Sequence, residues 1–105
     1  MFTIGRYQFN DPVALSGIDL IDRAAVYAIL CLQNGEYHVI YIGQTEQVGT
    51  RLSSHERAAC WRRNCSGTLY VAILWTPTST YTLDERLAIE QELIEEYDDP
   101  PCNRT

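Results

Sequence analysis

The stretch AVYAILCLQNGEYHVIYIGQT, residues 25–45, decides the fold. Two runs of β-branched and aromatic residues flank Asn34-Gly35, a pair that accepts the left-handed backbone of a tight turn. The pattern therefore predicts an antiparallel hairpin with strands at 25–32 and 37–42.

The length of the turn decides where two tyrosines of this hairpin point. A two-residue loop puts Tyr27 and Tyr41 on opposite faces of the sheet, because successive side chains alternate between faces. A three-residue loop, residues 33–35 with Gly35 left-handed, sets Tyr27 directly across from Tyr41. We predict the three-residue loop.

Further along the chain, the pattern indicates two helices and one more strand. The segment TRLSSHERAACWRR predicts a helix from about residue 50 to 63. Its three- and four-residue steps would align Arg51, His55, Ala58 and Arg62 on one side. A strand follows at 69–75 and stops before Pro77.

The second predicted helix covers LDERLAIEQELIEEYDD, residues 83–99, and ends at Pro100-Pro101. Glu90 projects from the middle of an otherwise apolar arc of this helix, which consists of Leu83, Leu87, Ile94 and Tyr97. These elements predict a small α+β (α/β) domain: a three-stranded, mainly antiparallel sheet flanked by helices, in the order β-β-α-β-α.

The length and composition fit one globular domain. The chain has 105 residues, of which 46% are hydrophobic. We expect residues 1–24 to be a lead-in with one short strand within FTIGRYQF, and residues 25–105 to form the domain proper. The longest apolar run, residues 24–32, is too short to cross a bilayer, and Met1 does not begin a secretory leader. We therefore expect a soluble, cytoplasmic protein with no membrane partner.

The cysteines carry no recognisable pattern. Cys31, Cys60, Cys65 and Cys102 lack C-x-x-C spacing, and a chain with this much apolar sequence does not need disulfides, so we predict reduced thiols. Cys60 and Cys65 near His55 match no standard zinc module.

Charge is segregated along the chain. The net charge is −6, and all eight basic residues are arginines, four of them between positions 51 and 63. Eight acids lie between Asp84 and Asp99. The pattern suits either an anion-binding face opposed to a metal-binding one or two helices with solvated outer faces.

Several short segments together resemble the GIY-YIG nuclease family. These are AVYAI at 25–29, YIGQT at 41–45, Arg51, His55, IEQELIEEY at 89–97 and Asn103, in the family's order and spacing. The resemblance runs from about Ala25 to Asn103. It departs from the family at Ala25 and Val26, which replace a glycine and an isoleucine, and at Gln44, where some relatives carry a lysine.

The resemblance implies roles for the residues that match. It implies that Glu90 binds the metal, and a carboxylate oxygen is a ligand that Mg²⁺ or Mn²⁺ prefers. From the residues alone, Glu90 could equally be a buried glutamate paired with Arg51 or Arg86. Arg51 offers a planar fork of donors to a phosphate, although a single helical arginine is usually just solvated.

His55 could donate a second hydrogen bond or move a proton near neutral pH, although a single histidine is more often structural. The resemblance places Tyr27 and Tyr41 at the active site, one handling the attacking water and the other the phosphate. The pattern alone would make them core tyrosines. We expect Gly43 to permit close approach of the backbone or an unusual backbone angle.

Two more residues complete the expected site. We expect Asn103 to fix a loop through its side chain, and Gln44 to stand beside the site. Phosphodiester hydrolysis needs an activated water, compensation of phosphate charge and help for the leaving oxygen, and these residue types supply all three.

We therefore expect a metal-dependent DNA endonuclease that uses one metal ion, with Arg57, Arg62 and Arg63 as further DNA contacts. Two alternatives stay open. The chain could bind nucleic acid or a protein without cutting, or it could be a catalytic subunit whose partner supplies affinity for DNA, since a net charge of −6 attracts phosphate weakly.

Overall fold

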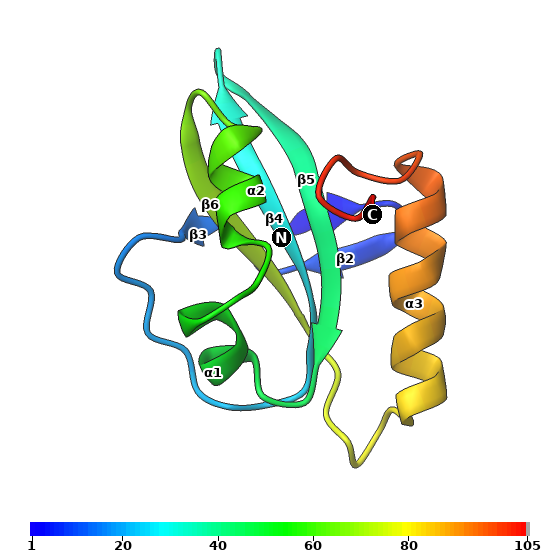
Figure 1. Ribbon diagram of the computed structural model, residues 1–105. Coiled ribbons are helices and arrows are strands. Elements are labelled where there is room, and N and C mark those ends of the chain that lie inside the picture. The colour runs from blue at the N-terminus through cyan, green and yellow to red at the C-terminus, as the bar shows by residue number, and fades with distance from the viewer. Residues whose placement is uncertain (105) are drawn as a thin grey trace.

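The computed structural model describes residues 1–104 as an α+β fold with antiparallel sheets (Figure 1); the expected domain end at residue 105 lies outside the described residues. The main sheet has four strands in the order β3-β6-β4-β5. Their bounds are Val13–Ala14 for β3, Ala25–Gln33 for β4, Glu36–Thr45 for β5 and Thr68–Trp75 for β6. The prediction of three strands was one short, because the lead-in supplies β3.

The lead-in also forms a hairpin of its own, β1 at Phe2–Ile4 and β2 at Tyr7–Phe9. Ile4 and Phe9 are fully buried against the main sheet and the last helix. The first residues are therefore part of the core rather than a tether.

Three helices complete the fold: α1 at Val48–Ser53, α2 at Ala58–Arg63 and α3 at Leu83–Glu96. The single helix predicted from residue 50 was wrong, because Ser54 is extended and separates α1 from α2. Side chains compete with the helix for backbone groups at this point. Ser53 donates to the Thr50 carbonyl, and the His55 ring accepts from the Arg57 amide.

The hairpin turn differs from the prediction. Asn34 and Gly35 both have positive φ and form a two-residue turn, so Gln33 pairs with Glu36. The predicted three-residue loop was wrong. A β-bulge then leaves Ile40 without a partner, and beyond it Tyr27 pairs with Gly43. One extra residue reverses the facing of every later side chain, so Tyr27 and Tyr41 share a face after all.

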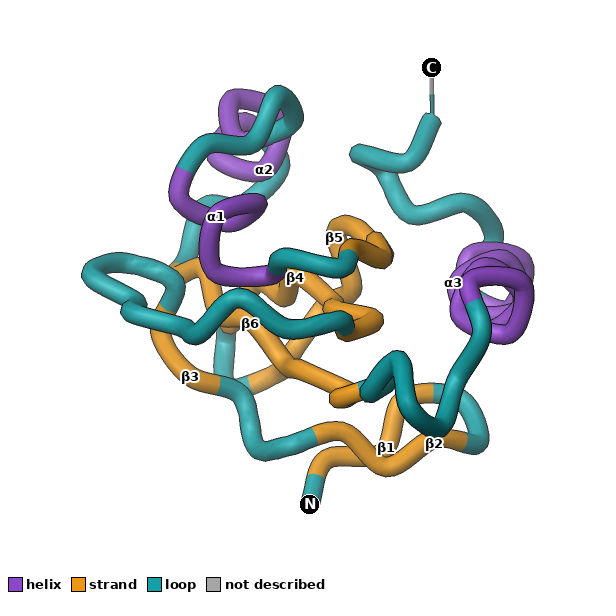
Figure 2. The backbone as a smooth tube through the Cα atoms, turned by 90° about the horizontal axis from the view of Figure 1, so that it is seen from below, coloured by secondary structure: helices purple, strands orange, loops and turns teal. Residues whose placement is uncertain are grey.

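Strand β4 is buried on both sides and divides the core into two layers (Figure 2). Helices α1 and α2 cover the face that carries Tyr27 and Ile29. Helix α3 and the β1–β2 hairpin cover the face that carries Val26 and Ala28.

Helix α3 begins with a capping box, in which the Thr82 side chain and the Glu85 side chain each bond the other's backbone amide. It buries Arg86, Ile89 and Leu93. The predicted apolar arc is therefore not the buried face: Leu83 is 50% exposed and Leu87 39% exposed. The part of the chain from 1 to 104 contains no helix long and apolar enough to span a membrane.

All four cysteines are paired, so the prediction of reduced thiols was wrong. Cys31 of β4 bonds Cys65, and Cys60 of α2 bonds Cys102. The partners are 34 and 42 residues apart in sequence, which is why local spacing gave no sign of them. Together the two bonds tie the short helix α2 to the sheet and to the C-terminal segment.

Candidate active site

The predicted site residues come from both layers and meet beside the edge strand β5. Tyr27 and Tyr41 stand on the sheet face under α1 and α2, and the segment between those helices supplies His55. Glu90 comes from α3, which packs along β5 from the other side (Figure 1).

The tyrosines and the histidine form a compact aromatic group. The ring centroids of Tyr27 and Tyr41 are 6.1 Å apart, and that of Tyr41 is 5.1 Å from His55. Trp61 of α2, fully buried, packs against the His55 ring with a tilt of 45° and a centroid distance of 4.5 Å. Packing on several sides fixes the orientation of these polar rings.

Gly43 makes room for Tyr27. A Cβ atom built on Gly43 would collide with the Tyr27 phenol ring. The backbone of Gly43 does not adopt positive φ, so the expected need for an unusual backbone angle is not met. Its function in the structure is to let the Tyr27 ring lie across β5.

His55 is neutral and in a defined tautomer. Its Nδ1 atom accepts a hydrogen bond from the Arg57 amide at 3.0 Å, so the ring proton resides on Nε2. Nε2 lies 2.9 Å from the Tyr27 hydroxyl and donates to it. Burial, together with the charges of Arg51 and Arg57, lowers the pKa of His55 to about 4. A histidine with so low a pKa stays neutral near pH 7, so the environment does not favour the proton transfer that the sequence suggested for His55.

The two phenols are held in their neutral form. Burial, and next the neighbouring Tyr41, raises the pKa of Tyr27, whereas Arg51 opposes the rise. The pKa of Tyr41 is raised by burial and by Glu90. Tyr41 is only partly buried whereas Tyr27 is 1% exposed, so Tyr41 is the phenol that a bound molecule can reach more directly.

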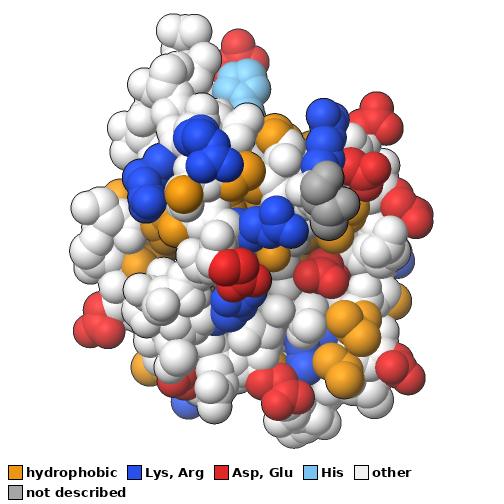
Figure 3. Space-filling view, viewed as in Figure 1, with side chains coloured by type: hydrophobic (Ala, Val, Ile, Leu, Met, Phe, Trp, Pro, Cys, Tyr) orange, Lys and Arg blue, Asp and Glu red, His pale blue; other side chains and the backbone are white. Residues whose placement is uncertain are grey.

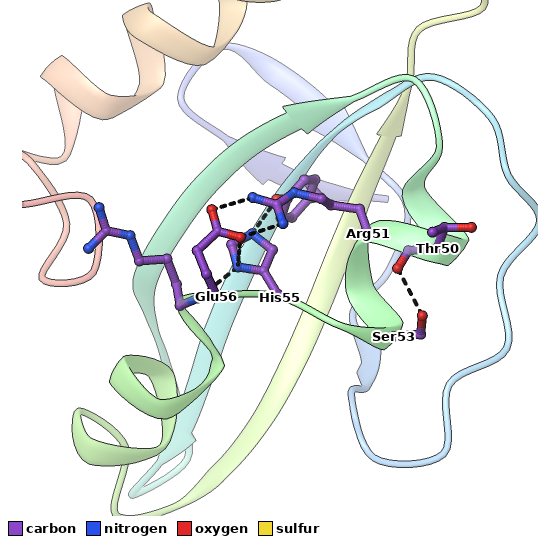
Figure 4. Close-up of polar contacts among 7 residues, drawn as sticks. Thr50, Arg51, Ser53, His55 and Glu56 are labelled. Atoms are coloured by element: carbon purple, nitrogen blue, oxygen red, sulfur yellow. Dashed lines mark hydrogen bonds and ion pairs between the residues drawn. The ribbon is translucent and has the colours of Figure 1, made fainter.

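Arg51 is already engaged by a carboxylate. Its two terminal nitrogens donate to the two carboxylate oxygens of Glu56 at 2.6 and 2.7 Å (Figure 4). The prediction that Arg51 and His55 share a helix face was wrong, because α1 ends between them. They are nevertheless close, since Glu56 also lies 3.9 Å from His55 Nδ1.

Glu90 is half buried beside the end of β5. Burial raises its pKa, and the backbone amide of Gln44 partly offsets this effect. It forms no ion pair with Arg51 or Arg86: Arg86 donates through Nε to Gln44 Oε1 at 2.9 Å and through Nη2 to Glu46 at 3.2 Å. The two arginines that could have paired with Glu90 therefore pair with other acids, Arg51 with Glu56 and Arg86 with Glu46.

The donor set fits one Mg²⁺ or Mn²⁺ ion bound mainly by water and substrate. Glu90 is a carboxylate that pairs with neither Arg51 nor Arg86, and it lies close enough to Tyr27 and Tyr41 for its charge to raise the pKa of both. Within residues 1–104, no three His, Cys, Asp or Glu side chains gather into a protein-only metal cage. A single carboxylate plus substrate phosphate is a common arrangement for Mg²⁺.

Asn103 holds the C-terminal segment against β5. Its side-chain oxygen accepts from the Ile42 amide at 2.9 Å, and its side-chain nitrogen donates to the Ile42 carbonyl at 2.8 Å. The Cys102 amide donates to the carbonyl of Ile40, two residues earlier on the same strand. These bonds satisfy an edge that would otherwise pair with another chain.

The three arginines predicted as further DNA contacts lie on the surface around the site. Arg62 and Arg63 are exposed on α2, and Arg57 reaches toward the C-terminal segment, donating to the Arg104 carbonyl at 3.4 Å. On the face shown in Figure 3, basic side chains gather over α2 and the C-terminal segment, whereas acids gather over α3. Among residues 1–104, no carboxylate pairs with Arg57, Arg62 or Arg63.

Nothing in the sequence indicated two contributors, Glu56 and Trp61. Glu56 is five residues from Arg51, a spacing that does not meet on a helix and becomes close only because α1 ends at Ser53. Arg86 was named from the sequence as a possible partner of Glu90, but it donates to Gln44 and Glu46 instead. Trp61 gave no signal beyond its size.

In comparisons with known proteins, the chain matches no family model, no curated protein and no solved structure.

Proposed function

We propose that the protein is a metal-dependent DNA endonuclease of the GIY-YIG type, with a fold of that kind. The observation that carries the proposal is the gathering of two phenols, one arginine, one neutral histidine and one half-buried carboxylate around the end of β5. These groups come from four separate elements and the segment between α1 and α2, and a purely structural role would not need so many polar groups in one place.

In this proposal each side chain has a task that its environment supports. Arg51 binds a phosphate oxygen pair through its planar fork. Neutral His55 donates from Nε2 to the Tyr27 hydroxyl oxygen, so it orients that hydroxyl. Tyr27 is thereby fixed, and Tyr41, the more accessible phenol, orients the attacking water or donates to the scissile phosphate.

Glu90 would hold the divalent cation, Mg²⁺ or Mn²⁺, beside the substrate phosphate. Such an ion polarises a phosphate oxygen and lowers the pKa of a bound water. Because both tyrosines are held neutral, neither begins as a phenolate at neutral pH. Their contribution is hydrogen bonding and orientation.

DNA is the proposed partner, with Arg57, Arg62 and Arg63 as contacts to its backbone. The net charge of −6 favours a second candidate, in which a basic protein partner supplies most of the affinity for DNA. Leu83 and Leu87, which are 50% and 39% exposed on α3, offer apolar surface for such a partner. The two disulfides favour an oxidising compartment over the cytoplasm expected from the sequence.

Incubation of the purified protein with supercoiled, branched and single-stranded DNA in Mn²⁺ tests the proposal. Cleavage of any of these substrates that disappears with chelator supports the endonuclease. Binding without cleavage of any substrate would favour a binding module instead. Cleavage that appears only with a co-purifying basic protein would favour the catalytic-subunit alternative.

A further inference from the structure

The Glu56 carboxylate occupies the end-on fork of Arg51, the donor pair that would bind a phosphate in the proposed function. Nη1 and Nη2 donate to its two oxygens at 2.6 and 2.7 Å, and the carboxylate presents two oxygens as a phosphate does (Figure 4). A phosphate cannot bind this fork in two-pronged fashion until Glu56 leaves.

Glu56 is placed so that it can leave. Its side chain is 66% exposed, whereas that of Arg51 is 31% exposed. It belongs to the irregular segment between α1 and α2, so rotation of its side chain into solvent disturbs no helix. Arg51, by contrast, belongs to α1 and lies against the tyrosines.

The charge of Glu56 persists over the whole physiological pH range. The hydrogen bonds from Arg51 lower its pKa to about 2. An exposed ion pair of this kind contributes little net stability, so a phosphate group, such as the singly charged phosphodiester of DNA, can compete with it.

We propose that Glu56 is a specificity-determining residue: an internal carboxylate that closes the end-on fork of Arg51 and yields only to a phosphate group that binds more strongly. This deepens the proposed function and rests on it for its biological meaning, although the exchange itself concerns Arg51 alone. Weak anions would then be excluded from the site, and the phosphate of a substrate would be admitted.

Titration with inorganic pyrophosphate, followed through the NMR signal of the Arg51 side-chain Nε–H, tests the exchange without any nuclease activity. In Glu56→Gln we expect pyrophosphate to bind about fivefold more tightly than in the wild type, the change that loss of one exposed ion pair allows. Glu36→Gln, at the distant hairpin turn, is the control for the loss of one negative charge.

Equal affinity in the wild type and Glu56→Gln, or an equal gain in Glu36→Gln, would overturn the inference. So would a pyrophosphate effect of Glu56→Gln that persists unchanged when Arg51 is replaced by Gln, with the affinities in that background measured by isothermal titration calorimetry. DNA cleavage is scored separately: a protein that never cuts DNA but shows the exchange leaves this inference standing, and an active nuclease without the exchange removes it.

Discussion

At the scale of single residues, the site depends on side chains whose neighbours leave them one arrangement. Tyr27 is the clearest case, because His55 donates to its hydroxyl and Gly43 leaves space for its ring. The tyrosines, Arg51, His55 and Glu90 could be named from the sequence because their types and order resemble a known motif. Their partners could not, since Glu56 meets Arg51 only where a helix breaks.

Gly43→Ala should push the Tyr27 ring out of place. Overpacking of this kind costs about 1–3 kcal/mol of unfolding free energy. Urea denaturation measures the loss. The same substitution in a Tyr27→Leu background should cost clearly less, because the colliding ring atoms are gone; an equal cost in both backgrounds would contradict the packing explanation.

His55 should make stability depend on pH in the acidic range. Its folded pKa, about 4, lies below the unfolded value of about 6.5, so its contribution is complete above pH 6.5 and is lost as pH falls toward 4. The loss is on the order of 3 kcal/mol. Unfolding of the wild type and of His55→Gln at pH 7 and pH 4.5 measures it, and a pH dependence that survives in His55→Gln would assign it to other groups.

At the scale of elements, the sequence allowed the hairpin turn to be predicted, but it did not allow the bulge, the helix break or the disulfide pairing to be predicted. Asn34-Gly35 indicated the hairpin, but the bulge at Ile40 left no mark in the apolar run VIYI. The break between α1 and α2 was hidden because the helical pattern continues through it. The disulfides join residues far apart in sequence, and only the folded chain shows which cysteines meet.

The Cys60–Cys102 bond should stabilise the junction of α2 with the C-terminal segment. Replacing both cysteines by serine removes the cross-link between two residues that lie 42 positions apart in sequence. The chain-entropy relation gives a loss of about 4 kcal/mol. Denaturation of this double variant, with Cys31→Ser/Cys65→Ser as the matched comparison, measures it; unchanged stability would mean that the bond contributes nothing in solution.

At the scale of the whole molecule, the site lies where the two layers of the core meet. The layer with α1 and α2 brings Arg51 and His55, and the layer with α3 brings Glu90. Strand β5 lies between these two groups of residues, and the Asn103 side chain forms hydrogen bonds with the free edge of this strand. The sequence could predict the hairpin, β6 and α3, but not that residues 1–24 would complete both the sheet and the core.

The central claim is that Glu90 holds the metal ion that DNA cleavage needs. Nicking of supercoiled DNA in Mn²⁺ by the wild type, Glu90→Gln and the exposed control Glu95→Gln tests it most directly. Glu90→Gln should be at least as stable as the wild type at pH 7, because burial raises the Glu90 pKa and its ionised form opposes folding above that pKa. Loss of the metal site should remove several kcal/mol of transition-state stabilisation, a fall of more than about a hundredfold in rate. We predict that Glu90→Gln is folded and inactive while Glu95→Gln cuts normally; nicking by Glu90→Gln at the wild-type rate would contradict the account.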